Sequence, residues 1–281
     1  MLIFYTNCIN KKNKIRYNIT YFYFVRIFIY VVVFSAQIFC RYSNTYCFSR
    51  NNTFTTSAHC SHITLESNHL VIDVTMIRLH KLLTGYNGKS IGNPVSCIFK
   101  RGSITAIVGT NGSGKSTLIK TIAGILPPIA GQLEFDSKIE AKRPSIGYLP
   151  QQPEIDRKFP LKVFEVVAMG SWPATGLLNS INTKQQNNIW HALTKVGLYD
   201  KAHCTIGSLS NGNFQRMLFA RILVQQASII LLDEPFTGID QYTCRLLINF
   251  VHQLHTNGCT ILIVLHDHML VANHFPITLM L

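Results

Sequence analysis

The chain has 281 residues, which is enough for one or two domains with a sizeable core. Hydrophobic residues make up 47% and charged residues 14%, a balance that excludes a disordered chain and leans toward the membrane without requiring a membrane span. Lys and Arg outnumber Asp and Glu by 26 to 13, and the net charge of +13 suits nucleic acid, an anionic membrane surface or phosphate ligands. The 8 cysteines include no CxxC pair, which argues against a disulfide scaffold or zinc site and favours a reduced, intracellular setting.

Residues 1–75 differ in composition from the rest of the chain. All 17 Gly and all 10 Pro lie after residue 75, although the turns of a folded segment need them. We therefore expect an N-terminal extension, residues 1–75, that is not part of the fold, with Met76 as the natural start. The apolar stretch Tyr21–Cys40, which follows a basic run, keeps a membrane anchor and an organelle-targeting segment open as alternatives. Four potential metal ligands in the extension are interpreted as scattered residues: His59, Cys60, His62 and His69.

A phosphate-binding loop is the first motif beyond the extension. Residues 104–108 form a short, β-branched apolar run that predicts a buried strand, and residues 118–126 predict a helix that Pro127 and Pro128 end. Between them the chain matches GxxxxGK[ST] in the strand–loop–helix context that this pattern requires. The loop consists of Gly109, Thr110, Asn111, Gly112, Ser113, Gly114, Lys115, Ser116 and Thr117.

Each residue type in this loop suits phosphate chemistry. Glycines let the backbone curl so that its N–H groups point at phosphate oxygens, and the helix N-terminus adds a partial positive charge. Lys115 would neutralise charge on the β- and γ-phosphates, and the Ser116 hydroxyl can bind Mg²⁺. The sequence therefore predicts binding of a nucleoside triphosphate.

Two further predicted strands end in chemically active side chains. Residues 228–232 run into Asp233 and Glu234. Residues 260–265 run into His266. Because parallel α/β sheets place ligands at the carboxyl ends of strands, we expect these side chains to converge on the ligand of the phosphate loop. Asp233 would hold Mg²⁺ through water, Glu234 would act as general base toward the attacking water, and His266 would contact the γ-phosphate.

A third motif lies between the phosphate loop and the predicted strand at 228–232. Residues 207–216 read Gly-Ser-Leu-Ser-Asn-Gly-Asn-Phe-Gln-Arg and precede a helical run to Gln226. At this point the chain resembles the ATP-binding-cassette (ABC) ATPases, the motor subunits of ABC transporters, whose Leu-Ser-Gly-Gly-Gln signature is similar to residues 209–213. The phosphate loop and the Asp-Glu-Pro strand look like the two Walker motifs of that family. The resemblance covers residues 76–281.

The resemblance implies roles for further residues. Gln151 is similar to the Q-loop glutamine and His266 to the switch histidine, so that these two and Glu234 would be the catalytic residues. Asp240 is similar to the D-loop aspartate, and Tyr86 stands where the family stacks an aromatic ring on adenine. The Mg²⁺ of Mg-ATP would be held by Ser116, Gln151 and Asp233. The signature residues would contact the ATP of a partner subunit: Ser210, Asn211, Gly212 and Asn213.

The fold that the resemblance implies is α/β. It has a P-loop NTPase core with a mostly parallel sheet, an antiparallel β subdomain and an inserted helical subdomain. Residues 76–281 would form the ATPase domain, with the helical subdomain at about 153–226. Helical patterns at 161–170 and 182–196 suit that subdomain, which would touch a membrane partner, and the last strand is expected at 276–281.

The implied function is ATP binding and hydrolysis by a subunit of an ABC transporter. Residues 154–170, with the pair Phe159-Pro160, and residues 237–240 look like the ATPases of importers for zinc, manganese or iron. The implied partners are an integral membrane permease, a second copy in an ATP-sandwich dimer and, indirectly, an external metal-binding protein. The chain would lie peripherally on the cytoplasmic face of the membrane, and no nucleic acid partner is expected.

The chain departs from the family pattern in two places. Asn211 and Asn213 replace Gly and Gln in the signature, which predicts hindered closure of the dimer and slow but real hydrolysis. The chain also ends directly after its last strand, where the family usually continues with a short helical tail; we expect this to affect regulation or edge packing rather than catalysis.

Three alternative functions stay open. An ABC ATPase that acts on ribosomes or DNA fits the net charge of +8 in residues 76–281 (19 basic minus 11 acidic), although such proteins usually carry two cassettes and this chain has no internal repeat. A nucleotide-binding regulatory subunit with little hydrolysis fits the altered signature. A plain P-loop kinase is disfavoured, because kinases lack the signature and the strand-end histidine.

Overall fold

Two β-sheets organise the part of the chain that the computed structural model describes, which comprises residues 75–136, 144–153, 155–176 and 179–281. Our predictions for residues 1–74 lie outside the described residues, including most of the extension, the apolar stretch and the four scattered metal ligands. The three-stranded antiparallel sheet has the order β2 (Lys89–Lys100), β1 (Thr75–Tyr86), β4 (Ala130–Phe135).

The second sheet has five strands, and every pair of neighbours in it is parallel. Its order is β5 (Ile146–Leu149), β6 (Ile229–Asp233), β7 (Thr260–Val264), β3 (Ile104–Val108), β8 (Ile277–Met280). The three central strands were predicted to within a residue, since continuous apolar runs bounded by polar residues are typical of strands that are buried on both faces. The expected P-loop architecture, with a parallel sheet and an antiparallel β subdomain, is confirmed.

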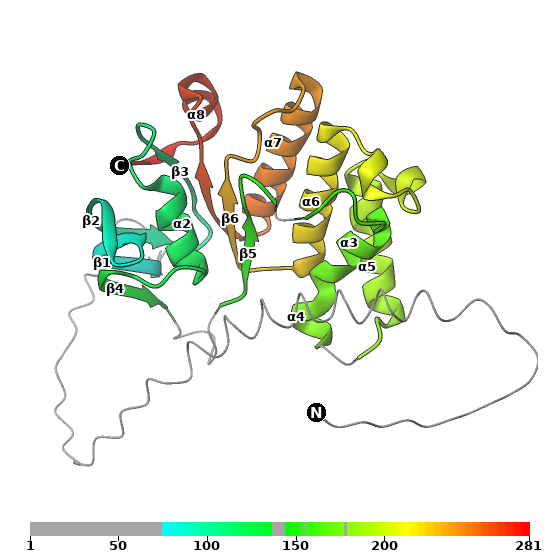
Figure 1. Ribbon diagram of the computed structural model, residues 1–281, viewed down its shortest axis with the longest axis horizontal. Helices are drawn as coiled ribbons and strands as arrows, with labels where there is room; N and C mark the ends of the chain where they lie inside the picture. The colour runs from blue at the N-terminus through cyan, green and yellow to red at the C-terminus, as the bar shows by residue number, and fades with distance from the viewer. Residues whose placement is uncertain (1–74, 137–143, 154, 177–178) are drawn as a thin grey trace, which may run out of the picture. The chain divides into compact units, whose positions relative to one another are not determined.

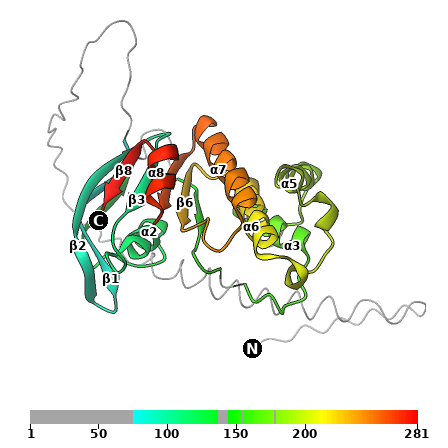
Figure 2. The ribbon, with the colours of Figure 1, turned by 90° about the horizontal axis from the view of Figure 1, so that it is seen from above.

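Helices cover both faces of the parallel sheet (Figures 1 and 2). The helix α2 lies between the two sheets, and α6 and α7 pack on the opposite face, with α3 and α5 beyond α6. The α-helices are α2 (Lys115–Ala123), α3 (Val163–Ala168), α4 (Trp172–Thr175), α5 (Thr183–Lys195), α6 (Asn211–Gln225), α7 (Gln241–Thr256) and α8 (His268–His274). Short 3₁₀-helices occupy Met169–Ser171, Tyr199–Lys201 and Ile206–Ser208.

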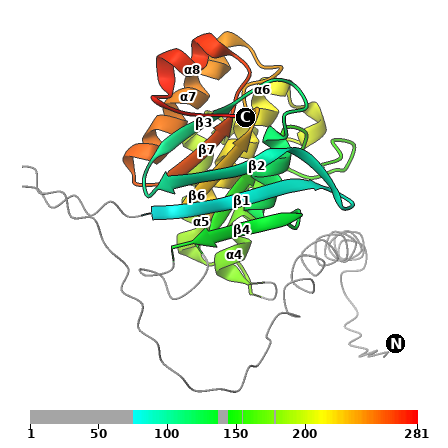
Figure 3. The same ribbon diagram turned by 90° about the vertical axis from the view of Figure 1, so that its left-hand side faces the viewer.

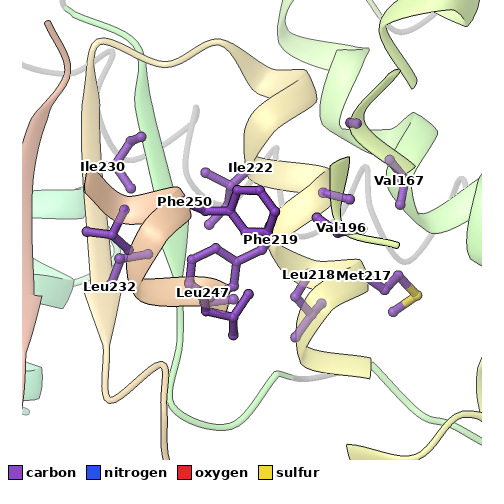
Figure 4. Packing of buried hydrophobic residues seen from close by; sticks show 14 of the residues in the cluster. Val167, Val196, Met217, Leu218, Phe219, Ile222, Ile230, Leu232, Leu247 and Phe250 are labelled. Atoms are coloured by element: carbon purple, nitrogen blue, oxygen red, sulfur yellow. The ribbon is translucent and has the colours of Figure 1, made fainter. Parts of the chain in front are cut away.

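The central strand β6 shows how the sheet separates two apolar cores. Successive side chains of a strand point to opposite faces. Ile229 and Leu231 face the core that α2 shares with the antiparallel sheet. Ile230 and Leu232 face the larger core under α6 and α7, where Phe219 packs with its neighbours (Figure 4). Because the strand is buried on both sides, its end cannot move without disturbing two cores.

The antiparallel sheet lies across the α2 side of the molecule (Figure 3). Its strand β1 contributes Ile77, Leu79 and Leu82, each at most 2% exposed, to the core that contains Leu118 and Ile122 of α2. The helix that starts at the phosphate loop is thus clamped between two sheets, which fixes the position of the loop.

The helix α2 ends earlier than the prolines predicted. It ends at Ala123, because Gly124 adopts a left-handed conformation with φ of +82° and donates its N–H to the carbonyls of Lys120 and Thr121. Glycine is the usual residue for such a helix end, since it lacks a Cβ. Pro127 and Pro128 lie in the connection that follows rather than at the helix end.

Candidate functional site

The phosphate loop and the predicted catalytic residues lie at the carboxyl ends of four neighbouring strands. The phosphate loop follows β3, Glu234 follows β6, His266 lies two residues beyond β7, and Gln151 two residues beyond β5. These four strands stand side by side in the order β5-β6-β7-β3. One edge of the parallel sheet therefore gathers residues from Gly109 to His266, which are 157 positions apart in the sequence.

The phosphate loop has the backbone geometry of an anion cradle. Gly112 and Gly114 have φ of +82° and +95°, values that residues with a side chain rarely adopt. A Cβ on Gly112 would meet nothing within 4 Å, so this part of the loop faces open space. The Ser113 hydroxyl is buried in the loop and has no hydrogen-bond partner among the described residues. This hydroxyl is therefore available to donate a hydrogen bond to a phosphate oxygen.

The loop lysine is buried and directed at the loop. Lys115 is 5% exposed, and its Nζ donates hydrogen bonds to the carbonyl oxygens of Gly109 at 2.9 Å and Thr110 at 2.7 Å. Burial lowers the pKa of Lys115, while the nearby carboxylates of Glu234 and Asp233 act in the opposite direction. An ammonium group that only carbonyl dipoles solvate is well suited to exchange them for phosphate oxygens.

Ser116 and Asp233 meet across the sheet edge. The Ser116 hydroxyl donates to Asp233 Oδ1 at 2.9 Å, although the two residues are 117 positions apart. Asp233 is 1% exposed, and its burial raises the pKa of the carboxyl, while the bond from Ser116 opposes this change. A hydroxyl and a buried carboxylate side by side are hard oxygen ligands of the kind that Mg²⁺ prefers.

Glu234 is the centre of a cluster of polar side chains. Its Oε2 accepts hydrogen bonds from Gln151 Nε2 at 2.7 Å and Thr237 Oγ1 at 3.3 Å, and its Oε1 contacts His266 Nε2. The backbone of Glu234 has φ of +48°, a left-handed conformation that costs of the order of 1–3 kcal/mol outside glycine. Its N–H donates to the Val264 carbonyl of the next strand at 3.2 Å, which holds the residue in this conformation.

The hairpin that carries Tyr86 packs against the phosphate loop. A Cβ on Gly92 would lie 2.7 Å from the Ser113 carbonyl oxygen, and one on Gly114 would lie 3.3 Å from that of Ile91. The start of β2 therefore touches the loop directly. Tyr86 ends the neighbouring strand β1 and is 40% exposed, so its ring has a free face for a ligand.

The signature residues form the N-terminus of α6. Ser210 is the N-cap: its Oγ accepts the N–H of Asn213 at 3.3 Å, which leaves the hydroxyl proton for another acceptor. Asn213 is 7% exposed, and its Oδ1 accepts from Arg216 of the same helix. Asn211 is exposed and accepts a hydrogen bond from Arg157.

Gly212 connects the signature to Asp240. A Cβ on Gly212 would lie 3.0 Å from Asp240 Oδ2 and from Thr243 Oγ1, so only glycine fits without displacement. Asp240 is the N-cap of α7, and it accepts the N–H of Thr243 at 2.9 Å and its hydroxyl at 2.7 Å. These hydrogen bonds from Thr243 lower the pKa of Asp240.

The structure thus forms two groups from the predicted residues. The first comprises the phosphate loop, Asp233, Glu234, Gln151 and His266. The second comprises residues 210–213 with Asp240, and no hydrogen bond from its side chains reaches the phosphate loop within the described ranges. Sequence reasoning assigned no role to the Thr237 hydroxyl or to Arg157. Thr237 contacts Glu234 from three positions away, whereas Arg157 contacts Asn211 across 54 positions, which no local pattern encodes.

Comparison with known proteins places this arrangement in a family. A family model described as "ABC transporter" matches residues 93–237, about half of the chain. The chain belongs to the ABC transporter family. This ABC ATPase is 38% identical over 200 residues to the manganese transport system ATP-binding protein MntB of Listeria innocua. The match covers 71% of this chain and 83% of the relative. It is 35% identical over 206 residues to the zinc transport system ATP-binding protein TroB of Treponema pallidum, covering 73% and 77%.

Solved structures agree with the family assignment. An inward-facing ABC transporter assigned to the metal-chelate type matches with a TM-score of 0.65 and 26% identity, covering 74% of this chain and 80% of the other. The structure of cbiO1 from Clostridium perfringens, part of the ABC transporter complex cbiONQ, matches with a TM-score of 0.61 and 27% identity, covering 74% and 84%.

The ABC ATPase fold confirms the function class that the motifs predicted. As a member of this family the chain binds and hydrolyses ATP, and the interpretation as a plain P-loop kinase is excluded. No helix in the described part of the chain is both long and apolar enough to cross a bilayer.

Proposed function

We propose that this ABC ATPase powers the import of a divalent metal ion (zinc, manganese or iron) through a separate membrane permease. The observation that carries the ATPase part is the cluster at the sheet edge, where Glu234 meets Gln151 and His266 next to the Ser116–Asp233 pair. The names of the relatives, which are manganese and zinc transport systems, support the cargo class. The ATPase domain would span residues 76–281, with the helical subdomain at about 153–226.

The residues at the sheet edge fit a magnesium–triphosphate ligand. The orphaned Ser113 hydroxyl and the Lys115 ammonium suit phosphate oxygens, while Ser116 and Asp233 supply oxygen ligands. Gln151 offers its Oε1 as a third ligand, because its Nε2 already donates to Glu234. Mg²⁺ at this place would offset the charge that develops on the β- and γ-phosphates.

The side chains of this copy divide the work of hydrolysis. Lys115 binds the β- and γ-phosphates, and Tyr86 offers its ring to adenine. Glu234 accepts a proton from the attacking water, and Gln151 and Thr237 hold the carboxylate in place. His266 contacts the same carboxylate. It would also contact the γ-phosphate, so that loss of the phosphate would change its surroundings.

The second group of residues serves a second copy of the chain. Two copies would enclose two ATP molecules, with the phosphate loop of each facing residues 210–213 of the other. Ser210 would donate its hydroxyl proton and α6 its N-terminal amides to the γ-phosphate. The described contacts support this division, since these residues bond to their own surroundings and to no phosphate-loop atom. Hydrolysis would remove the bridging phosphate and open the pair.

The partners follow from the proposed transport function. An integral membrane permease would contact the helical subdomain, and an external metal-binding protein would deliver the ion to that permease. The ATPase would lie peripherally on the cytoplasmic face of the membrane. No nucleic acid takes part in this scheme.

Co-expression with candidate permeases tests the proposal. The full chain should co-purify with a polytopic permease, and vesicles that contain the pair should accumulate ⁵⁴Mn²⁺ or ⁶⁵Zn²⁺ only when ATP is present on the ATPase side. The variant Lys115→Ala serves as the control for ATP dependence. Uptake that is equal with and without ATP, or association with ribosomes or DNA instead of a permease, would contradict the proposal.

A regulatory subunit with little hydrolysis is the second candidate, and the exposed Asn211 favours it. The rate of ATP hydrolysis distinguishes the transport ATPase from the regulatory subunit. A purified complex that binds ATP but releases phosphate no faster than a Glu234→Gln variant would favour the regulatory role.

A further inference from the structure

A loop of the helical region is attached to the segment that leads into the signature. Ile206 N–H donates to the Leu161 carbonyl at 2.9 Å, and Val163 N–H donates to the Cys204 carbonyl at 3.0 Å. A Cβ on Gly207 would lie 2.7 Å from the Arg157 carbonyl oxygen, a distance that a side chain could not occupy. The backbone at residue 157 is therefore held close to the start of the signature.

The Arg157 side chain extends from this loop to the first turn of α6. Its Nη1 donates to Asn211 Oδ1 at 3.0 Å, and its guanidinium carbon lies 4.1 Å from the centre of the Phe214 ring. Asn211 and Phe214 are three positions apart and hence lie on the same face of the helix. Phe214 is 6% exposed, so the ring offers a fixed surface for the guanidinium group.

This contact fixes the orientation of the Asn211 amide. Arginine can only donate hydrogen bonds, so the amide oxygen faces Arg157 and the NH₂ group faces away from it. The sequence suggested that Asn211 adds bulk where the family has glycine. In the structure that bulk is held toward the supporting loop, and not left to rotate in front of the helix N-terminus.

The positive charge of Arg157, which lies beside the first turn of α6, has no acidic partner in that turn of the helix. A cation beside a helix N-terminus is unfavourable, since the helix dipole already makes that end positive. The first turn of α6 contains no acidic residue that would compensate it. Asp240 of α7, which lies against Gly212, is an acidic group that faces this turn. A phosphate group at the same end would add a second negative partner for the Arg157 charge.

We propose that Arg157 is a positioning residue for the signature: it holds Asn211 aside and keeps Ser210–Asn213 open to the γ-phosphate of the ATP that a second copy binds. This inference rests on the proposed function of the signature. It explains how a chain with Asn in place of Gly retains a usable signature, and it assigns a role to a residue outside the family motifs.

The variant Arg157→Met tests the proposal with little disturbance of packing, because methionine keeps the contact with the Phe214 ring and removes the donor and the charge. We expect steady-state hydrolysis to fall at least tenfold, the size of one hydrogen bond to a charged group. ATP affinity of the single copy should stay unchanged, since Lys115 and its loop are intact. Arg157→Lys should recover part of the rate, because it restores the charge without the planar fork. Lys158→Ala, which removes the adjacent exposed cation, is the matched control and should keep the full rate.

A double-mutant cycle with Asn211→Gly separates positioning from general destabilisation. With glycine at 211 there is no amide to hold, so Arg157→Met should lose most of its effect in that background. An equal loss in both backgrounds, or a fall in melting temperature that accounts for the lost rate, overturns the proposal.

The ATP-dependent dimer of the Glu234→Gln variant distinguishes this inference from the proposed function. If that dimer forms and Arg157→Met leaves it unchanged, the positioning role is wrong and the ATPase assignment stands. If the Glu234→Gln variant forms no dimer with ATP at all, the proposed role of the signature toward a second copy is wrong together with the positioning role, while membership of the ABC transporter family stands.

Discussion

Replacing Glu234 by Gln separates the chemical step from nucleotide binding. The carboxylate accepts from Gln151 and Thr237 and contacts His266. A glutamine of the same shape keeps an acceptor for Gln151 but cannot take a proton from water. Loss of a positioned general base slows a reaction by about 10²–10⁴-fold, which is about 2.7–5.5 kcal/mol of barrier.

The same substitution should change the stability of the fold little. A neutral side chain at 234 removes a repulsion with the buried Asp233, whose pKa is raised by burial and also by Glu234, and it removes an attraction to the buried Lys115, so the two effects oppose each other. The hydrogen bonds are exchanged rather than lost, and the free energy of unfolding should change by less than about 1 kcal/mol.

Three measurements on the full chain check this prediction: phosphate release at saturating ATP, nucleotide affinity, and thermal unfolding without nucleotide. Glu134→Gln, which removes an exposed carboxylate from β4, is the control and should behave as the wild type in all three. A Glu234→Gln variant with normal turnover would refute the assignment of Glu234 as the base. Loss of ATP binding in that variant would refute the separation of the two functions.

The other predictions concern the phosphate loop, the signature and Asp240. Lys115→Ala should lose most ATP binding in a nucleotide titration, because the variant lacks the buried ammonium group that contacts the loop carbonyls. An unchanged affinity for ATP would contradict the role of Lys115. The double reversion Asn211→Gly with Asn213→Gln, assayed with the partner permease, should speed up hydrolysis and increase the ATP-bound dimer in the Glu234→Gln background, whereas no gain in either would mean that the asparagines are neutral. The pKa of Asp240 lies below its ordinary value because Thr243 donates to it, so its stabilisation is present above about pH 4 and is lost as the pH falls through the folded pKa. Asp240→Asn should therefore unfold with a weaker dependence on pH below about 4 in acid titrations followed by circular dichroism, and identical titrations would refute this reasoning.

The sequence predicted those parts of the fold that local chemistry determines. The strands at 104–108, 229–233 and 260–264 are continuous apolar runs, and such runs leave few alternatives in a chain with a phosphate loop. The sequence predicts the end of α2 at Pro127, which is too late, because Gly124 already allows the left-handed turn that ends the helix at Ala123. Gly124 and Pro127 both favour the end of a helix, and the helix ends at the one that comes first in the chain.

The contacts of the site could be predicted only in part. The convergence of Asp233 and His266 on the phosphate loop follows from parallel strand ends meeting at one edge. The bond between Arg157 and Asn211 joins residues 54 positions apart, from a loop and a helix end, and neither segment has a periodicity that reveals it. The burial of Asn213 was also not predictable from a local pattern. Its side chain lies on the inward face of α6, and its amide oxygen accepts a hydrogen bond from Arg216 of the same helix.

The ladder between β6 and β7 has a consequence for insertions and deletions. Asp233 pairs with Val264, and Glu234 N–H donates to the Val264 carbonyl, so the contact of Glu234 with His266 depends on the pairing register. Removing one residue within β7 would shift His266 by about 3.3 Å and turn the following side chains to the other face. Gly258 lies in the turn before β7, and a Cβ there would meet nothing within 4 Å. The turn can therefore change in length during evolution, whereas the strand cannot gain or lose a single residue without separating Glu234 from His266.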